Sequence, residues 1–297
     1  MYTILVPTYG IKGLSMLDDL LYSISKFDNP SLDNIIVSDD GSNADTIPML
    51  SSLVDKYSNT FDIIPIYNQI YHSFSKTVNR GLEISNRNND VLLLNNDMLA
   101  MTSFEPFVEF IKEKQNNYQN NDRNNDQNNN HNKIGIIGAK LLYPNDTIQH
   151  AGMARMRLIK RFRHIYKYRN SDHPPTNDPR KYIAVTGACH YIRRDLIDKI
   201  GYFDENYILS YEDVDYCLNA QYNGYEVWYI PDVVMTHLES ATRTDPYSEQ
   251  NRALLWKKWG GSYETIRASQ NIPDDDLDVK VVEASGITGL YTLLRKF

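Results

Sequence analysis

The sequence NIIVSDDGS, residues Asn34–Ser42, is a short apolar segment that runs directly into two aspartates, a glycine and a serine. Its apolar part has the length and the β-branched content of a buried strand. Similar segments lie on both sides of it, namely YTILV (Tyr2–Val6), Phe61–Tyr67 and DVLLL (Asp90–Leu94). The first third of the chain therefore predicts four strands.

Helical segments separate these strands. Three stretches have apolar residues at helical spacing: about Leu14–Phe27, about Asp45–Tyr57, and a stretch marked by Phe74, Val78 and Leu82. Parallel neighbouring strands need crossovers, which are usually helices, so this alternation predicts a doubly wound α/β fold with a mostly parallel central sheet.

Polar residues follow three of the predicted strands at the point where each strand ends. They are Thr8-Tyr9 after the first strand, Asp39-Asp40 after the second, and Asn95 to Asp97 after the fourth. Each cluster by itself is also explained by turn formation, because Asp, Asn, Gly and Ser favour turns. Ligands of open α/β sheets bind at the carboxyl ends of the strands, so the three clusters together predict a binding site at that edge.

A second informative stretch is ILSYEDVDYCLNAQYNGYEVWYIPDVVMTH, residues Ile208–His237. Glu212 and Asp213 begin a helix that ends at Asn223-Gly224. A carboxylate at a helix N-terminus is held ionised and can serve as a general base, although charge preference at helix starts explains the same residues. On this helix we expect one apolar face and one polar face, formed respectively by Val214, Cys217, Leu218 and Tyr222, and by Asp215 and Asn219. A strand follows, Pro231 is expected to end it, and the next apolar residues lead to His237.

The sequence between and after these two stretches predicts further helices and strands and two segments of less regular structure. Residues 114–133 are almost entirely Asn, Gln and Asp, so we expect a disordered insertion after a helix near Thr102–Glu113. The basic and aromatic segment Arg155–Lys181 is interpreted either as a solvated loop or as a lid that carries positive charge to a diphosphate. Other expected elements are a strand at Ile134–Tyr143, two strands around a turn at Gly187 with a short helix after them, and a helix at Tyr247–Trp259.

Composition restricts the classes of function. The 297 residues are 41% hydrophobic and 23% charged, as in an ordinary soluble globular protein, and the net charge of −7 argues against nucleic acid as a partner. Cys189 and Cys217 form no metal-binding or disulfide pattern, which favours a reducing compartment. We see no signal-peptide pattern and no run near the roughly 20 apolar residues that span a bilayer. We therefore expect a cytoplasmic protein, soluble or peripheral to a membrane.

Five motifs in order resemble the family 2 glycosyltransferases of GT-A fold, in the rhamnosyltransferase-like branch. They are ILVPTYG, VSDDGS, LLLNNDM, TGACHYIRRDLIDKIGYFDENY and YEDVDYCLNAQYNGYEVWYIPDVVMTH, which lie between Tyr2 and Arg243. The resemblance implies a GT-A domain over residues 1–265, with a short C-terminal helical tail at 266–297. It also implies transfer of a sugar, with inversion, from a UDP- or dTDP-sugar to a hydroxyl of a glycan or glycoconjugate.

Individual roles are carried over from the resemblance, position by position. It implies that Asp213 is the catalytic base beside Glu212, and that Asp97 and His237 bind Mn²⁺ or Mg²⁺. The residues implied to contact the nucleotide sugar are Pro7, Thr8, Tyr9, Asp39, Asp40, Asn79, Asn95, Asn96, Gly187 and Ala188. A nucleoside diphosphate leaving group develops negative charge, and a hard divalent cation held by oxygen ligands neutralises that charge. The implied metal-binding role of Asp97 agrees with this chemistry.

Two positions depart from the family pattern, and two other functions are compatible with parts of the sequence. The metal motif is Asn95-Asn96-Asp97 with a single carboxylate, and Gly10 stands where the family usually has Asn. A nucleotidyltransferase would need a Gly-rich phosphate loop, for which PTYGIKGL is a poor candidate. A non-catalytic module that binds nucleotide sugar or glycan fits a degenerate metal motif, but it does not explain Glu212, Asp213 and His237 together. The C-terminal run GLYTLLRKF could dock on the domain, mediate an oligomer or touch a membrane surface.

Overall fold

The computed structural model describes residues 1–41, 46–68, 73–122, 133–156, 160–238 and 246–272. Its first half alternates strands and helices. The strands are β1 (Tyr2–Thr8), β2 (Leu32–Asp39), β3 (Ile63–Tyr67) and β4 (Asp90–Leu94), and the helices are α1 (Gly10–Ile24), α2 (Ile47–Tyr57) and α3 (Phe74–Ile84). β1 pairs in parallel with both β2 and β4, and β2 pairs in parallel with β3. The predicted doubly wound arrangement is confirmed.

The second half completes the sheet with strands of both directions. Its elements are β5 (Met98–Ala100), α4 (Glu105–Asp122), β6 (Lys133–Leu142), β7 (Ile148–His150), β10 (Arg180–Lys181), β11 (Cys189–Ile192), α5 (Arg194–Ile200), α6 (Glu212–Tyr222) and β12 (Tyr225–His237). The strand order is β10-β12-β6-β11-β4-β1-β2-β3, with β5 paired to β12 and β7 to β6. β11 runs antiparallel to both of its neighbours, so the sheet is mixed.

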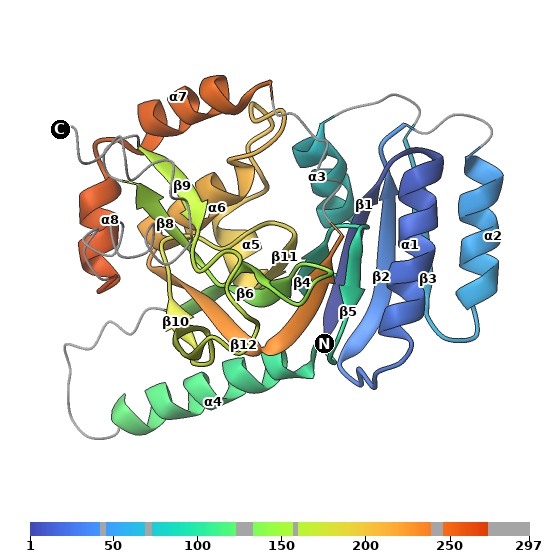
Figure 1. The fold of residues 1–297 in the computed structure, drawn as a ribbon, viewed down its shortest axis with the longest axis horizontal. Helices are drawn as coiled ribbons and strands as arrows, with labels where there is room; N and C mark the ends of the chain where they lie inside the picture. The colour runs from blue at the N-terminus through green and yellow to red at the C-terminus, as the bar shows by residue number, and fades with distance from the viewer. Residues whose placement is uncertain (42–45, 69–72, 123–132, 157–159, 239–245, 273–297) are drawn as a thin grey trace.

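Smaller elements lie at one end of the molecule. β8 (Met153–Met156) and β9 (Arg161–His164) form a separate two-stranded sheet, followed by a short 3-10 helix at Pro174–Thr176. α7 (Ser248–Trp259) and α8 (Tyr263–Ser269) end the described chain. Figure 1 shows these two helices beside β8 and β9, at the end of the molecule away from α1 and α2.

Helices cover both faces of the sheet because successive side chains of each strand point to opposite faces. Ile4 and Leu92 belong to one buried cluster, while Leu5 and Leu93 belong to the other. The first cluster packs under α1, α2 and α4, and the second packs under α3, α5, α6, α7 and α8. Burial on both faces explains why these strands are continuous apolar runs in the sequence.

Several expectations about local structure need correction. Pro231 does not end a strand: β12 continues through it, and its pairing with β6 shifts register between Tyr229 and Val234, which lets a residue without an N–H fit. The segment before Gly187 forms only an isolated bridge at Ala184 and no strand. α4 runs on to Asp122, into the stretch expected to be disordered, and residues 123–132 lie outside the described part.

The basic segment after Arg155 is also more ordered than expected. Phe162, Ile165 and Tyr166 are buried, so the described part is not a solvated loop. The tail expected at 266–297 begins inside α8, and everything after residue 272 lies outside the described chain.

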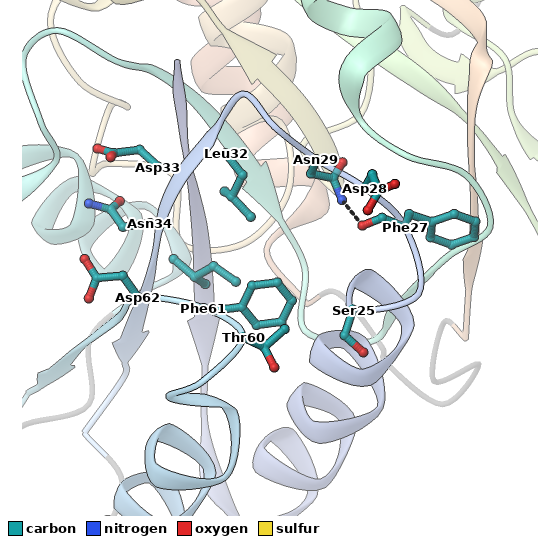
Figure 2. Close-up of a pocket in the computed structure, with 11 residues that line it drawn as sticks. Ser25, Phe27, Asp28, Asn29, Leu32, Asp33, Asn34, Thr60, Phe61 and Asp62 are labelled. Atoms are coloured by element: carbon teal, nitrogen blue, oxygen red, sulfur yellow. Dashed lines mark hydrogen bonds between the residues drawn. The ribbon is translucent and has the colours of Figure 1, made fainter.

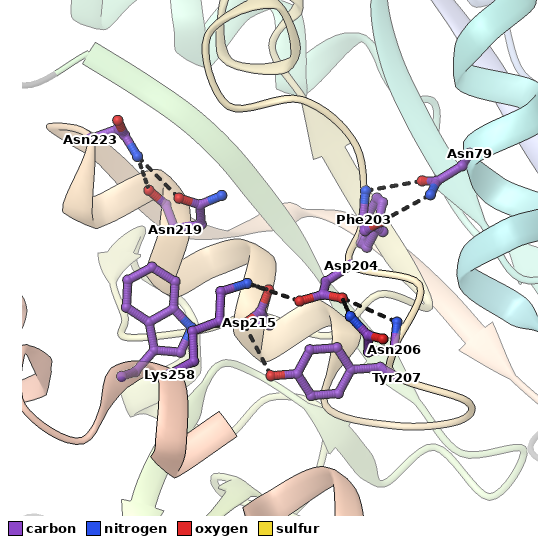
Figure 3. A network of polar contacts seen from close by, with 10 residues as sticks. Asn79, Phe203, Asp204, Asn206, Tyr207, Asp215, Asn219, Asn223 and Lys258 are labelled. Atoms are coloured by element: carbon purple, nitrogen blue, oxygen red, sulfur yellow. Dashed lines mark hydrogen bonds and ion pairs between the residues drawn. The ribbon is translucent and has the colours of Figure 1, made fainter. Parts of the chain in front are cut away.

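The helix α6 begins and ends as predicted, but two of its side chains are placed otherwise. Tyr222 is 64% exposed, whereas Asp215 is only 3% exposed. Asp215 is buried because other segments supply its partners: Tyr207 donates from 3.1 Å, Trp259 Nε1 from 2.7 Å and Lys258 Nζ from 2.9 Å. Figure 3 shows Lys258 reaching both Asp215 and Asp204, so this network ties α7 to α6.

Candidate active site

Strand pairing brings the expected motifs together at the carboxyl edge of β4. Because β11 is antiparallel to β4, its first residue Cys189 lies opposite Leu94, the last residue of β4. The Gly187-Ala188 turn therefore meets the Asn95–Asp97 segment, and the backbone N–H of Asn95 donates to Ala188 O at 3.0 Å. The end of β12 arrives from the other side, where His237 pairs with Met98.

Asp97 and His237 are in direct contact. His237 Nε2 lies 3.1 Å from Asp97 Oδ1, and His237 Nδ1 lies 2.8 Å from Gln149 Oε1. The amide oxygen of Gln149 only accepts hydrogen bonds, so Nδ1 carries the hydrogen and the Nε2 lone pair of a neutral ring faces the carboxylate. Two acceptors at this distance repel each other unless a cation or a proton lies between them.

This arrangement fits a divalent cation. A carboxylate oxygen and an imidazole nitrogen are both metal ligands, and a metal-binding histidine commonly donates its other N–H to an oxygen acceptor, as His237 does to Gln149. Within the described residues no group of three or more His, Cys, Asp or Glu side chains could hold a metal. Among the described residues Asp97 and His237 are thus the two side chains that could hold a cation here, and further ligands would come from a diphosphate and water.

Asp213 lies on the other side of the Gly187-Ala188 turn. Its Oδ2 accepts the backbone N–H of Gly187 at 2.9 Å, and its Oδ1 accepts that of Val214 at 2.7 Å. Burial raises the pKa of this carboxyl above its ordinary value of 3.8, and the two N–H groups oppose that rise. A carboxylate with a raised pKa that keeps fixed hydrogen bonds is suited to take a proton from a substrate hydroxyl.

A cavity of about 230 Å³ opens in front of Asp213. Its lining comes from β8, β9 and the start of α6 and α7, and includes Arg161, His164, Tyr211, Asp213 and Ser248. Glu212 does not line it and is only 9% exposed. Of the two adjacent acids, Asp213 is thus the one placed to meet a substrate.

The ends of β1 and β2 form the neighbouring part of the site. Asp40 N–H donates to Thr8 O at 2.8 Å, and Thr77 Oγ1 donates to Asp40 Oδ1 at 2.6 Å. Asn96 Nδ2 donates to Thr8 Oγ1 at 3.0 Å and to Gly13 O at 3.1 Å, which joins this part to the Asp97 segment. The predicted convergence of three strand ends is therefore present in the structure.

Asn79, Pro7, Tyr9 and Asp39 are also implied to contact the nucleotide sugar, and the structure shows where each of them lies. Asn79 exchanges hydrogen bonds of 2.9 Å with the backbone N–H and C=O of Phe203, so its amide anchors the 203–205 segment to α3. Pro7 is a buried residue inside β1, Tyr9 is 56% exposed before α1, and Asp39 is buried at 2% exposure. We leave Asn79 out of the proposed nucleotide contacts because both ends of its amide are occupied.

Three polar residues near the site were missed in the sequence. The motifs assign no role to Gln149 and His150, and His164 lies in the basic and aromatic segment Arg155–Lys181, which is interpreted only as a solvated loop or a charged lid. The alternation of buried residues in β7, Ile148–His150, was too short a signal to show that a histidine faces a site. Their roles depend on partners far away in the sequence.

A second cavity, of about 290 Å³, lies at the opposite edge of the sheet, where β2 and β3 begin. Figure 2 shows Asp28, Asp33 and Asp62 around it, with Phe61 between them. It is separated from the strand ends by the length of β2, so it is not part of the candidate active site.

The chain matches the family described as "Glycosyltransferase like family 2" over residues 1–254, and it belongs to that family. Membership supports transfer of a sugar from a nucleotide-sugar donor. The fold is the GT-A fold, with a mostly parallel central sheet flanked by helices, as expected. No helix in the described part of the chain is long and apolar enough to cross a membrane.

Two curated relatives match part of the chain. An uncharacterized protein of Sinorhizobium fredii, y4gI, is 32% identical over 125 residues, which are 40% of this chain and 14% of that protein. The O-antigen biosynthesis protein RfbC of Myxococcus xanthus is 29% identical over 125 residues, which are 37% of this chain and 9% of that protein. The match to RfbC fits the rhamnosyltransferase-like branch. The matched region is thus a small fraction of each relative's length.

Solved structures share the fold at low sequence identity. GalNAc-T7, crystallised with UDP, GalNAc and Mn²⁺, has a TM-score of 0.64 and 14% identity, over 96% of this chain and 55% of that chain. TarS of S. aureus, residues 1–349 in complex with UDP-GlcNAc, has a TM-score of 0.55 and 18% identity, over 86% of this chain and 66% of that chain.

Proposed function

We propose that the protein is an inverting, metal-dependent glycosyltransferase that moves a sugar from a UDP- or dTDP-sugar to a hydroxyl of a glycan or glycoconjugate acceptor. The observation that carries this proposal is the path Asp213–Gly187–Ala188–Asn95. The Asp213 carboxylate lines a cavity, and the Gly187-Ala188 turn connects it to the segment that carries Asp97 of the Asp97–His237 pair. A base and a diphosphate site at opposite sides of one reaction centre are what direct displacement requires.

In the proposed reaction Asp213 takes the proton of the acceptor hydroxyl while the hydroxyl oxygen attacks the anomeric carbon of the donor. A bond from that oxygen to the anomeric carbon forms, the bond to the diphosphate oxygen breaks, and the configuration inverts. The Gly187 and Val214 N–H groups hold the carboxylate in place throughout. A divalent cation held by Asp97 and His237 would neutralise charge on the diphosphate as it leaves.

The nucleotide is assigned to the ends of β1 and β2. Asp40 is held by Thr77 and linked to Thr8, so its carboxylate has a fixed orientation at this edge. A fixed carboxylate can accept a hydrogen bond from the imide N–H of uracil or thymine, which agrees with the UDP- or dTDP-sugar that the family resemblance implies. The hydrogen bond from Asn96 to Thr8 connects the ends of β1 and β2 to the segment that carries Asp97.

The test combines binding with turnover. A thermal-shift panel of nucleotide sugars, each with and without Mn²⁺ or Mg²⁺, should show metal-dependent stabilisation by the true donor. Sugar transfer or donor hydrolysis should then disappear with chelator and in Asp213→Asn, while Asp213→Asn retains donor binding. The matched control is Asp198→Asn, an exposed position on α5. Donor binding without any turnover in the intact protein would favour the non-catalytic module instead.

A further inference from the structure

Two histidines from different strands form a hydrogen bond with each other beside the cavity that Asp213 lines. His150, at the end of β7, has its Nδ1 2.9 Å from Nδ1 of His164, at the end of β9. The two rings meet edge to face with centroids 4.9 Å apart. The family resemblance assigns no role to either residue.

The surroundings of His150 determine which nitrogen carries its hydrogen. Its Nε2 accepts the backbone N–H of Gly152 at 3.3 Å and that of Thr186 at 3.4 Å. An imidazole nitrogen that accepts has no hydrogen, so a neutral His150 carries its hydrogen on Nδ1.

The tautomer of His150 determines that of His164. Since His150 Nδ1 donates, His164 Nδ1 is the acceptor, and the hydrogen of a neutral His164 lies on its Nε2. Burial, followed by the charges of Lys167, His237 and Arg163, lowers the pKa of His164 to about 3. Burial, with the neighbouring histidines, likewise lowers the pKa of His150 well below its ordinary value of 6.5. Both rings are therefore neutral near pH 7.

His164 is the member of the pair that reaches the cavity. It lines the cavity together with Asp213, and its Nε2 has no hydrogen-bonding partner among the residues that the structure describes. His150, by contrast, is completely buried behind it. The cavity lining thus includes both a histidine that is an N–H donor when neutral and a carboxylate acceptor, a complementary pair for a molecule rich in hydroxyl groups.

We infer that His164 contacts the sugar acceptor, donating from Nε2 to an acceptor oxygen while Asp213 receives the proton of the attacking hydroxyl, and that His150 is the positioning residue that fixes this tautomer. This inference rests on the proposed function, because the acceptor is placed in the cavity by the role of Asp213. It names two residues for acceptor recognition, whereas the donor is assigned to the ends of β1 and β2.

The tautomer is measurable without any substrate. Two-bond hydrogen–nitrogen correlation spectra of protein labelled with nitrogen-15 histidine distinguish protonated from unprotonated ring nitrogens, and His164→Gln identifies the His164 signals. From about pH 6 to about pH 8 we expect hydrogen only on Nε2 of His164 and only on Nδ1 of His150. Hydrogen on His164 Nδ1, or a doubly protonated His164, would overturn the inference.

Kinetics test the contact itself. His164→Ala should raise the acceptor KM about tenfold or more while leaving the metal-dependent thermal shift by the donor unchanged. His164→Gln, whose amide can place an N–H near the Nε2 position, should recover part of that loss. A purely structural role would weaken donor and acceptor binding together and would not be rescued in this way.

A control substitution and two contrary results separate the inference about His164 from the proposed function. His173→Gln changes a histidine that packs on Tyr166, outside the cavity lining, and should keep the acceptor KM of the unchanged protein. If the unchanged protein transfers sugar and folded His164→Ala keeps its acceptor KM, the inference is wrong and the proposed function stands. If the unchanged protein transfers sugar from no donor, the proposed function itself is wrong.

Discussion

His237 Nε2 lies 3.1 Å from Asp97 Oδ1, while the other ring nitrogen of His237 is fixed by Gln149 Oε1 at 2.8 Å. The histidine ends β12, Asp97 follows β4, and Gln149 lies in β7, so three strands define the geometry of this pair. Gln149 has no charge and would not be a metal ligand of first choice. Its effect on the site is to orient the imidazole.

We therefore predict that Gln149→Leu weakens the proposed metal site without removing either of its proposed ligands. The concentration of Mn²⁺ needed for half-maximal transfer should rise about 10- to 100-fold, because an outer partner orients the liganding ring. The measurement is a Mn²⁺ titration of the transfer rate at saturating donor. Gln115→Leu, on an exposed part of α4, is the matched control and should leave the titration unchanged. An unchanged Mn²⁺ titration in Gln149→Leu would show that the His237–Gln149 bond has no role in metal binding.

A second prediction concerns pH. Burial raises the pKa of Asp213 above 3.8, and the carboxylate must be ionised to accept a proton. As pH falls through the raised pKa, Asp213 becomes protonated and kcat/KM falls, so the acidic limb of the profile should lie above 3.8. Donor affinity measured over the same range should not follow that limb. A profile that stays flat down to about pH 4 would contradict the assignment of Asp213 as the base.

Much of this site was readable from the sequence because its main elements are local. Asn95–Asp97 and Asp39-Asp40 each follow an apolar run directly, and Glu212-Asp213 begins a helix with a clear end at Asn223-Gly224. A parallel sheet brings such strand ends to one edge without further information. The fold class and the convergence of these motifs followed from that rule, and the structure confirms both.

What the sequence did not reveal depends on contacts between distant segments. Helical spacing predicts that Asp215 lies on a polar helix face, yet Tyr207, Lys258 and Trp259 surround it in the structure. Asn79 was expected at the nucleotide but bonds with the backbone of Phe203, 124 residues away. Helical periodicity reports which side chains share a face, and it says nothing about a polar partner that arrives from another element.

A third prediction uses the close approach of Gly187 to the base. A Cβ built at Gly187 would lie 3.2 Å from Asp213 Cβ, tighter than ordinary van der Waals contact. Gly187→Ala should therefore displace the Asp213 carboxylate from its hydrogen bond with the Gly187 N–H, and lower kcat about tenfold or more with little change in donor affinity. Gly261→Ala, where an added Cβ meets no atom within 4 Å, is the matched control. Full activity in Gly187→Ala would show that the turn does not position Asp213.

The last prediction concerns the stability of the α6–α7 junction. Asp215 is 4% exposed at its side chain and is paired with Lys258, which is 35% exposed. Asp215→Asn keeps the size of the side chain but removes the charge that Lys258 meets and weakens the bonds from Tyr207 and Trp259. We expect a loss of about 2 kcal/mol in the free energy of unfolding, below the value for a fully buried pair because water reaches Lys258.

Urea denaturation followed by tryptophan fluorescence measures this loss directly, since Trp259 is part of the network. The matched control is Asp198→Asn. Asp198 pairs with Arg87 at 3.5 Å, and both side chains are at least half exposed, so the free energy of unfolding should change by about 0.5 kcal/mol or less. Equal effects of the two substitutions would mean that the Asp215 network adds no more stability than a surface ion pair. A larger effect at Asp215 would show that α7 is held to α6 by this buried carboxylate and thereby supports Ser248, the residue through which α7 lines the cavity.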